Sequence, residues 1–478
     1  MGPFFNKIIV FLLLPIYTAN FDPASYGDND LSMTTVTMLA SLLFMEVWTP
    51  LLRFSYDEHT LEGKQKIFTN VVSLSGACFP LYIAGCVLIA FWQELPNPGW
   101  MIAYGLSLLI LHIAQFEVRA IGDSKDFMIS GMVSSVFQFI LSAVLIYGFR
   151  VGAVAILIAP AVSNVLAAMY IEARHRFLRK VRLKDVSKAM LRDLTKYSFP
   201  LAINAVAFWG MTNINRYFAK WYLSEDANGY IALANKFAAL IVTLIKVYAL
   251  AWQESAYEHS GSDQRSRYYS KMLVVYMDFM AFGTAAVIVG TNVLFPFFID
   301  DAYTLTQLIL PIYYLSAFAN AMSNFYGHIF NAEKKTNILL YSTLLGAAVN
   351  IGLLYATIQI WGLYAVPIAL TLGYLANVLM RILSIQKTVK VSFDLKRLAL
   401  DIVVMAAACG IVYCGCSAVW KVLYGLLLCG GLGLLYREKL KTAMKTVREN
   451  FVNRLKIKKK ELRWRKNYAE CRTNIEKF

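Results

Sequence analysis

Two cationic side chains, Arg216 and Lys236, stand inside apolar segments of the sequence, where an isolated charge is costly. Each lies ten residues from Asp226, in the turn between two neighbouring segments, so both are expected at one depth, about 10 Å below the membrane surface. Two cations at one depth repel each other unless an anion joins them, and neither segment has a carboxylate placed to do so. A diphosphate would suit the pair, since arginine offers a planar fork of donors and lysine a point charge. The alternative is that both long side chains reach outward to the membrane surface.

A second group of ionisable residues lies toward the opposite membrane surface. Glu46 and Arg53 are seven residues apart, a spacing that places them on one face of a helix, and Glu117 and Arg119 fall at the corresponding depth of another segment. Two interpretations stay open: the four residues pair with one another, or they form the site that first binds a lipid diphosphate. Lys246, near the same surface, is a further candidate for substrate binding, with an interfacial position as the alternative.

Buried carboxylates are the candidates for ion coupling. Glu46 lies well inside an apolar segment, where burial favours exchange of a proton near neutral pH. Asp278 is the second candidate. No organic cofactor is expected, and the coupling ion would be H+ or Na+.

The sequence has no pattern typical of a resident metal or of catalysis. Asp28-Asn29-Asp30 resembles the metal-binding pair of glycosyltransferases, but it is expected on the outer side, where nucleotide-sugar donors are absent. Cys414 and Cys416 have no second pair of ligands, and the odd number of cysteines predicts no disulfide framework. The outer loops are too short for a catalytic domain, so we expect no enzyme activity. The histidines are scattered without metal-ligand spacing, at His59, His112, His175, His259 and His328.

The segments that must position these residues are long and apolar. The chain has 478 residues, 58% of them apolar and 16% charged, and a mean hydropathy of +0.52. Apolar runs of about 18 to 25 residues recur, each long enough at about 1.5 Å per residue to cross roughly 30 Å of hydrocarbon. Alternating strands are absent, so the sequence predicts an all-α polytopic membrane protein. About fourteen spans are expected, at 4–20, 31–54, 67–92, 99–118, 127–148, 151–172, 198–222, 229–252, 272–297, 307–330, 336–357, 361–385, 397–414 and 419–436.

Lys and Arg residues alternate from one predicted loop to the next. Every second loop is rich in them, whereas the opposite side of the membrane receives only Arg150, Lys220 and Lys421. Because basic loops stay in the cytoplasm, the pattern predicts a multi-pass protein of the cytoplasmic (inner) membrane with both termini cytoplasmic. The basic loops are predicted at 53–66, 119–126, 173–197, 253–271, 331–336 and 381–397.

Much of the net charge of +16 lies in residues 437–478. An apolar stripe along one side of this basic segment is typical of a helix that lies on anionic lipid. Nucleic acid is not an expected partner, and docking of a partner protein and disorder are the open alternatives. The stripe consists of Leu440, Met444, Val447, Phe451 and Leu455.

A weak internal repeat divides the chain. A shift of 210 residues places Val151–Tyr170 on Trp361–Met380, with Gly152 on Gly362. Because six spans is an even number, two copies would enter the membrane from the same side and be related by an axis along its normal. We therefore expect a cavity between two six-helix lobes. The predicted parts are a lobe at 1–175, a basic cytoplasmic linker at 176–197, a second lobe at 198–385, two extra spans within 397–436 and the basic tail at 437–478.

A series of short motifs lies on successive spans over nearly the whole chain. They resemble, in the same order, those of polysaccharide repeat-unit flippases, the Wzx-type branch of the MOP exporter superfamily, whose members resemble MATE transporters in fold. The family's usual Asp-Arg pair near the end of the seventh span reads Asn215-Arg216 here. The motifs are Leu14-Pro15-Ile16-Tyr17-Thr18, Pro23-Ala24-Ser25-Tyr26-Gly27, Glu46, Leu52-Arg53-Phe54, Lys196-Tyr197-Ser198-Phe199-Pro200-Leu201, Asn215-Arg216, Gly229-Tyr230, Ala234-Asn235-Lys236, Ala251-Trp252 and Lys334-Lys335-Thr336.

The resemblance implies a bacterial flippase for undecaprenyl-diphosphate-linked oligosaccharides, which works by alternating access while the polyprenyl tail stays in lipid. Such a protein serves the synthesis of O-antigen lipopolysaccharide, capsule or exopolysaccharide, so the polysaccharide polymerase machinery is a further expected partner. One alternative is a MATE-type drug or metabolite antiporter, which would favour acidic and aromatic residues in its cavity for cationic substrates. Another is a membrane polymerase or ligase of the same sugars, which would need a large outer loop.

Overall fold

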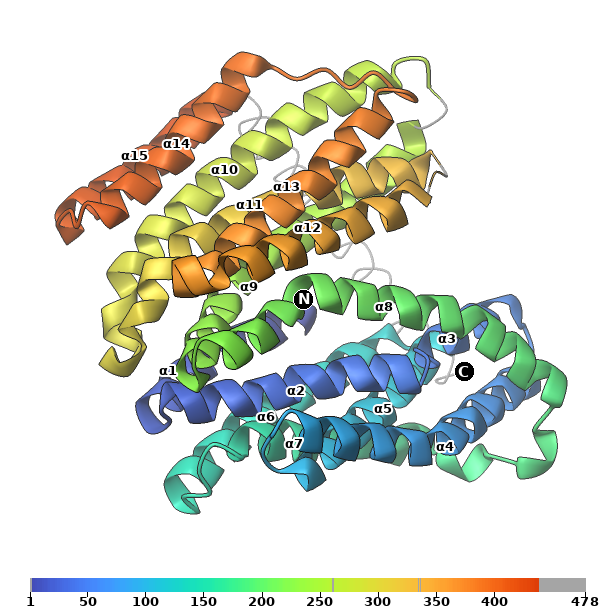
Figure 1. Ribbon diagram of the computed structural model, residues 1–478. Coiled ribbons are helices and arrows are strands. Elements are labelled where there is room, and N and C mark those ends of the chain that lie inside the picture. Colours follow the sequence, from blue (N-terminus) through green and yellow to red (C-terminus); the bar gives the residue numbers. More distant parts are fainter. Residues whose placement is uncertain (1, 260–261, 334, 336, 438–478) are drawn as a thin grey trace, which may run out of the picture.

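The structure is a bundle of long helices. The computed structural model describes residues 2–259, 262–333, 335 and 337–437, and within them all regular secondary structure is helical (Figure 1). The amphipathic helix predicted in the tail falls outside the described residues. The α-helices are α1 (Gly2–Asn20), α2 (Pro23–Leu43), α3 (Trp48–Asp57), α4 (Leu61–Trp92), α5 (Pro98–Ala120), α6 (Ser124–Ala143), α7 (Ala155–His175), α8 (Lys188–Tyr222), α9 (Glu225–His259), α10 (Arg265–Phe298), α11 (Thr304–Ala332), α12 (Asn337–Trp361), α13 (Ala365–Ile385), α14 (Leu395–Tyr413) and α15 (Ala418–Leu435). Shorter helical turns are η1 (Val144–Gly148), η2 (Leu178–Lys180), η3 (Leu183–Asp185), η4 (Asp301–Tyr303) and η5 (Gly362–Tyr364).

Within the described residues, fourteen helical spans match the predicted spans one for one when α2 and α3 are counted together. Eight segments are long and apolar enough to cross a membrane by themselves, and the bent pair α2–α3 makes a ninth. One of the eight, residues 337–385, contains both α12 and α13, which pack against each other as a hairpin. The other helices, α1, α8, α9 and α14, complete the set. The predicted all-α polytopic membrane fold is therefore confirmed.

The second span is broken near its middle. Helix α2 ends at Leu43, α3 begins at Trp48, and the two helices are bent by 44° from each other. Met45 and Glu46 lie in the break with φ values of 54° and 51°, a backbone conformation that residues other than glycine seldom adopt. The prediction that Glu46 and Arg53 share one helix face is therefore wrong, because no continuous helix joins them.

The same span also begins earlier than predicted. The carboxylate of Asp22 accepts a hydrogen bond from the backbone N–H of Ser25 at 2.9 Å, and Pro23 occupies the first turn. This backbone hydrogen bond lowers the pKa of the Asp22 carboxyl. Helix α2 thus starts at Pro23 rather than at residue 31, which brings Asp30 inside the helix.

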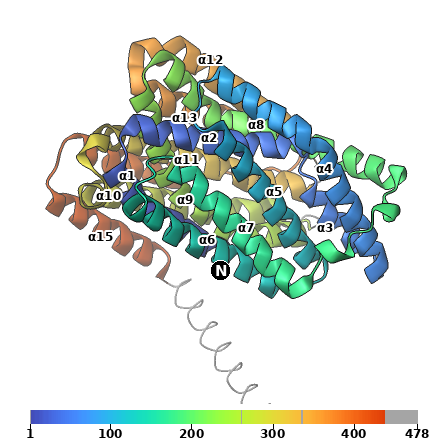
Figure 2. The ribbon, with the colours of Figure 1, turned by 90° about the horizontal axis from the view of Figure 1, so that it is seen from below.

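The helices form two groups with α8 between them. In Figure 1, α2 to α7 gather in the lower half of the molecule and α10 to α15 in the upper half. Helix α2 packs against both α8 and α9, and α8 also packs against α12. Helices α14 and α15 pack against α10, and α15 lies at one edge of the bundle (Figure 2). The boundaries of the two predicted lobes stay a prediction.

Candidate functional site

Asp30 binds both cations that the sequence singles out. Its Oδ2 lies 2.8 Å from Nη1 of Arg216 on α8, and its Oδ1 lies 2.7 Å from Nζ of Lys236 on α9. The side chains of Asp30 and Arg216 are only 4% and 1% exposed. The anion that joins the two cations is therefore a carboxylate of the protein. We call Asp30, Arg216 and Lys236 the Asp30 cluster.

This finding corrects the expectation that no carboxylate stands between Arg216 and Lys236. The prediction considered only the two spans that carry the cations and assigned Asp30 to an outer loop. Because α2 begins at Pro23, Asp30 lies about two turns inside the helix, at the depth of both cations.

Arg216 has neutral partners as well. Its Nε donates to Asn228 Oδ1 at 3.1 Å, its Nη2 to the carbonyl oxygen of Gly27 at 3.0 Å, and its Nη1 to Thr34 Oγ1 at 3.3 Å. A buried guanidinium with these partners does not reach the membrane surface, so outward extension is excluded for Arg216. Lys236 is different, since 26% of its side chain is exposed.

Around the Asp30 cluster the backbones of α2 and α9 touch. A Cβ added to Gly27 would lie 2.5 Å from the backbone nitrogen of Gly229, and one added to Gly229 would lie 2.0 Å from the carbonyl oxygen of Pro23. Only glycine permits such an approach. The ends of α2 and α9 next to the α8–α9 turn are therefore closed against each other.

The other residues that were predicted to bind substrate lie apart from the Asp30 cluster. Arg53 is half exposed and pairs with Asp57 at 2.5 Å. The guanidinium of Arg119 lies over the ring of Phe127, 5.1 Å from its centroid. Lys246 belongs to α9, but its side chain falls outside the described part of the chain.

The predicted ion-coupling residues have different surroundings. Glu46 is half-buried at the break between α2 and α3, and Asp278 is fully buried on α10. Glu117, which the sequence placed near Arg53 and Arg119, is buried on α5. The alternative in which Glu46, Arg53, Glu117 and Arg119 pair with one another does not hold for the two arginines. Arg53 pairs with Asp57, and Arg119 packs on an aromatic ring.

A buried cation that the sequence analysis missed is Arg381 on α13. It is 7% exposed. Its Nε donates to Ser342 Oγ at 2.9 Å, its Nη1 to the carbonyl oxygen of Ser323 at 2.5 Å, and its Nη2 to Thr343 Oγ1 at 3.4 Å. These partners are neutral oxygens, and within the described residues no ion pair joins Arg381 to a carboxylate. Its positive charge is therefore uncompensated.

Arg381 lines a polar cavity of about 230 Å³ between α8, α11, α12 and α13. We call it the Arg381 cavity. Amide side chains dominate its polar lining, and they accept and donate hydrogen bonds at one site. These are Asn204, Asn320, Asn324, Asn331 and Asn377. The cavity thus combines a fork of cationic donors with groups that suit hydroxyls.

Arg381 was missed because it was counted with the basic loop predicted at 381–397, although the span predicted at 361–385 also contains it. Helix α13 continues to Ile385, so Arg381 remains within the helix. A signal was present, since Asn377 lies four residues earlier and therefore on the same helix face. Both side chains are buried.

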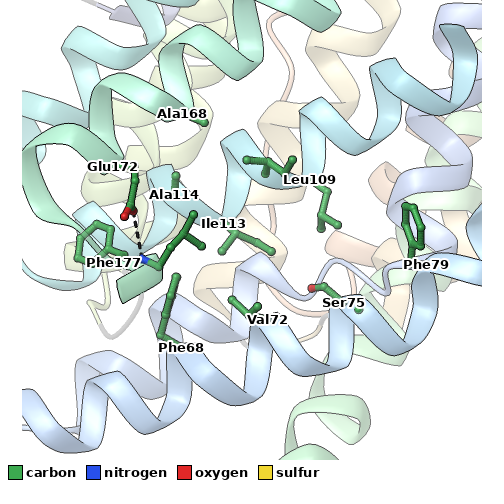
Figure 3. A pocket seen from close by; sticks show the side chains of 13 residues that line it. Phe68, Val72, Ser75, Phe79, Leu109, Ile113, Ala114, Ala168, Glu172 and Phe177 are labelled. Carbon is green, nitrogen blue, oxygen red and sulfur yellow. Dashed lines mark hydrogen bonds between the residues drawn. The ribbon is translucent and has the colours of Figure 1, made fainter. Parts of the chain in front are cut away.

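A separate cavity of about 290 Å³ is apolar (Figure 3). Phe68 and Val72 of α4 and Ile113 of α5 line it, together with Phe177 beyond α7. Glu172 is on its rim, where it accepts a hydrogen bond from the backbone N–H of Leu178 at 3.1 Å. This lining suits hydrocarbon rather than a sugar or a phosphate.

Three possible metal ligands, Asp123, Asp126 and His175, lie with their ligand atoms within 4.8 Å of one another. Asp126 already pairs with Nε of Arg174 at 2.7 Å and accepts a hydrogen bond from Tyr170 at 3.1 Å. A guanidinium thus occupies the position on the carboxylate that a metal ion would need. We interpret this cluster as an ion-pair network that joins α6 and α7.

Comparisons with known proteins agree on family and fold. The profile of a family described as "Polysaccharide biosynthesis protein" matches residues 1–253. A solved structure described as "Lipid II flippase MurJ, inward closed conformation" superposes with a TM-score of 0.70 at 15% identity, over 92% of this chain and 98% of that chain. An inward-facing multidrug resistance MATE family transporter of the MOP superfamily gives a TM-score of 0.63 at 16% identity, over 80% and 96%. No curated protein sequence matches the chain.

Proposed function

Because this chain belongs to the polysaccharide biosynthesis protein family, we propose that it carries oligosaccharides linked to undecaprenyl diphosphate across the bacterial cytoplasmic membrane. The cargo moves from the cytoplasmic to the outer leaflet, for assembly of a surface polysaccharide such as O-antigen or capsule. The fold, shared with flippases and transporters, suits alternating access.

The observation that carries this proposal is the uncompensated charge of Arg381 in a cavity of amides. Removing an ion from water costs several kcal/mol, and within the described residues no carboxylate offsets that penalty for Arg381. A diphosphate supplies the missing negative charge, and a guanidinium binds phosphate oxygens through two parallel hydrogen bonds. The asparagines beside Arg381 would bind the first sugar through its hydroxyls.

The Asp30 cluster and the Arg381 cavity lie toward opposite ends of the bundle. Arg381 is near the end of α13, on the side of the α11–α12 loop, whereas the Asp30 cluster is near the α8–α9 turn. In this conformation the Asp30 cluster holds α2 to α8 and α9, closing one end. Transport would require the ion pairs of the Asp30 cluster to break after the cargo binds in the Arg381 cavity at the other end. The polyprenyl tail would stay in the bilayer meanwhile.

Ion coupling is a further part of the proposal. Glu46 at the bend of the second span is half-buried, and a bend is a place where helices change their angle. Uptake of H+ or Na+ there would couple the angle between α2 and α3 to the ion gradient.

The experiment compares Arg381→Gln, Arg381→Lys and the control Arg192→Gln, which removes an exposed arginine of the same charge. The first readout is transfer of lipid-linked oligosaccharide in a strain that lacks its own flippase, with protein levels matched. The second is binding of undecaprenyl diphosphate to the purified protein.

Loss of a charge-assisted contact of roughly 1.5–3 kcal/mol should weaken binding about tenfold to a hundredfold in Arg381→Gln. Arg381→Lys should recover part of the affinity, and Arg192→Gln should match the wild type. Unchanged binding and transfer in Arg381→Gln would rule the site out.

A drug antiporter is the second candidate function, because the fold is also similar to that of a MATE transporter. A cationic drug would meet the positive charge of Arg381, which disfavours its binding. Protection of cells against cationic dyes that is retained in Arg381→Gln would favour the antiporter over the flippase.

A further inference from the structure

Two buried carboxylates, Asp278 and Asp401, face each other where α14 packs on α10. Both residues have no exposed surface. Asp401 lies four residues after Arg397 on α14, and Arg397 itself contacts Asp278, so the same face of α14 presents both groups to α10. This carboxyl pair lies outside both the Asp30 cluster and the Arg381 cavity.

The hydrogen bonds of the carboxyl pair are incomplete. Asp278 Oδ2 accepts from the hydroxyl of Tyr436 at 2.5 Å and from Nη1 of Arg397 at the long distance of 3.4 Å. Asp278 Oδ1 and both carboxylate oxygens of Asp401 have no hydrogen-bond partner within the described residues. Buried polar atoms are normally paired, so three orphan carboxylate oxygens at one helix contact point to a ligand that donates a hydrogen bond.

The charges do not balance either. Within the part of the chain that the structure describes, the charged and titratable groups that face the pair are Arg397 on α14 and Tyr436, which directly follows α15. One guanidinium opposes two carboxylates, which leaves one negative charge in a buried site. Like charges that share such a site cannot both ionise at low cost.

We propose that Asp278 and Asp401 share one exchangeable proton, which makes the α10–α14 contact a proton-binding site. The proton bonds to an oxygen of Asp401 and donates toward Asp278 Oδ1, so that one negative charge remains opposite Arg397. A metal cation is disfavoured, because hard cations take six or more oxygen ligands and only three oxygens here lack a partner.

The proton has a structural consequence for the last two helices. Helices α14 and α15 both pack against α10, and this carboxyl pair lies at that contact. Removal of the proton would leave an unbalanced carboxylate at the contact and weaken the attachment of the α14–α15 hairpin. The inference does not depend on what the protein transports.

The test uses infrared spectroscopy of the purified full-length protein, in which a protonated carboxylic acid gives its own carbonyl band. We expect this band in the wild type at neutral pH and its loss as pH rises. It should be absent from Asp401→Asn and Asp278→Asn, and retained in the control Asp301→Asn, which replaces an exposed acid. Absence of the band from the wild type would overturn the proposal without any variant. Loss of the band on addition of sodium chloride at constant pH would show that a sodium ion displaces the proton, and it would overturn the proposal of a proton-binding site.

Thermal unfolding gives an independent measurement. The wild type should lose stability as pH rises, because the pair then loses its proton. Asp401→Asn carries a neutral amide of the same shape, so its unfolding temperature should fall less over the same pH range. An identical pH dependence in both proteins would contradict a shared proton.

Discussion

The carboxylate of Asp30 lies 2.8 Å from the guanidinium of Arg216, although 186 residues separate them in the chain. The same carboxylate also holds Lys236, so three helices converge on one buried acid. Because Asp30 belongs to α2 and its partners to α8 and α9, the contact joins the predicted first lobe (1–175) to the predicted second lobe (198–385). Any conformation that is open at this end must separate these charges or give each a new partner.

Replacing Asp30 by Asn should destabilise the protein strongly. Removing one partner of a buried ion pair leaves an uncompensated charge, which costs about 3–5 kcal/mol. We expect the free energy of unfolding of the purified protein to fall by about that amount. The matched control is Asp28→Asn, which removes the neighbouring pair with Lys220. It should cost less than Asp30→Asn, because Asp28 and Lys220 keep 16% and 11% of their side chains exposed.

A double-mutant cycle tests the contact itself. Arg216→Gln in the Asp30→Asn background should cost much less than Arg216→Gln alone, since the two residues act as one pair. Additive losses would show that they stabilise the protein independently.

Gly229→Ala tests the close approach of α2 and α9. The new Cβ would lie 2.0 Å from the carbonyl oxygen of Pro23, so the backbones must separate. We expect a lower unfolding temperature and impaired transport. Gly99→Ala is the control, because open space surrounds Gly99 and the added methyl group should be tolerated. Normal stability of Gly229→Ala would mean that the ends of α2 and α9 are not tightly closed in the membrane.

The spans could be predicted from the sequence because hydrocarbon imposes a length and a composition on every crossing helix. The break between α2 and α3 at residues 44–47 was not predicted, although Pro50 in the first turn of α3 cannot donate the backbone hydrogen bond that a continuous helix would need there. Two of these residues adopt positive φ values that no local pattern signals. The predicted common face of Glu46 and Arg53 failed for that reason.

The candidate site was predicted only in part. Arg216 and Lys236 were found because a charge within an apolar run is conspicuous. Asp30 was missed because its span was predicted to begin at residue 31, whereas α2 begins at Pro23. Arg381 was missed because it was counted with a basic loop that overlaps the end of its correctly predicted span. Contacts between residues far apart in the chain depend on how the helices pack, and the spacing of residues along the sequence does not reveal them.

The orientation in the membrane is a prediction that reporter fusions test. Basic loops remain in the cytoplasm, so a reporter inserted near Arg182 or fused after Phe478 should be cytoplasmic. A reporter inserted near Pro96 or Asp301 should be exported, because those loops lack basic residues. A cytoplasmic signal at Asp301 would contradict the predicted alternation of the spans.

Arg216 and Lys236, which the sequence treated as equivalent, should now differ when each is replaced by Gln. Arg216 is buried with partners on every nitrogen, so Arg216→Gln should lower both stability and transport. Lys236 keeps about a quarter of its side chain exposed and has Asp30 as its partner.

We therefore expect Lys236→Gln to leave the unfolding temperature close to that of the wild type. Its transport should still fall about tenfold if Lys236 transfers from Asp30 to the passing diphosphate, since one charge-assisted contact is then lost. Lys236→Arg keeps the charge and should restore most of the activity. Unfolding measurements and lipid-linked oligosaccharide transfer on the same preparations separate the two effects. If Lys236→Gln unfolds as early as Arg216→Gln, the lysine serves only to hold α9 against α2, and no role in binding cargo remains for it.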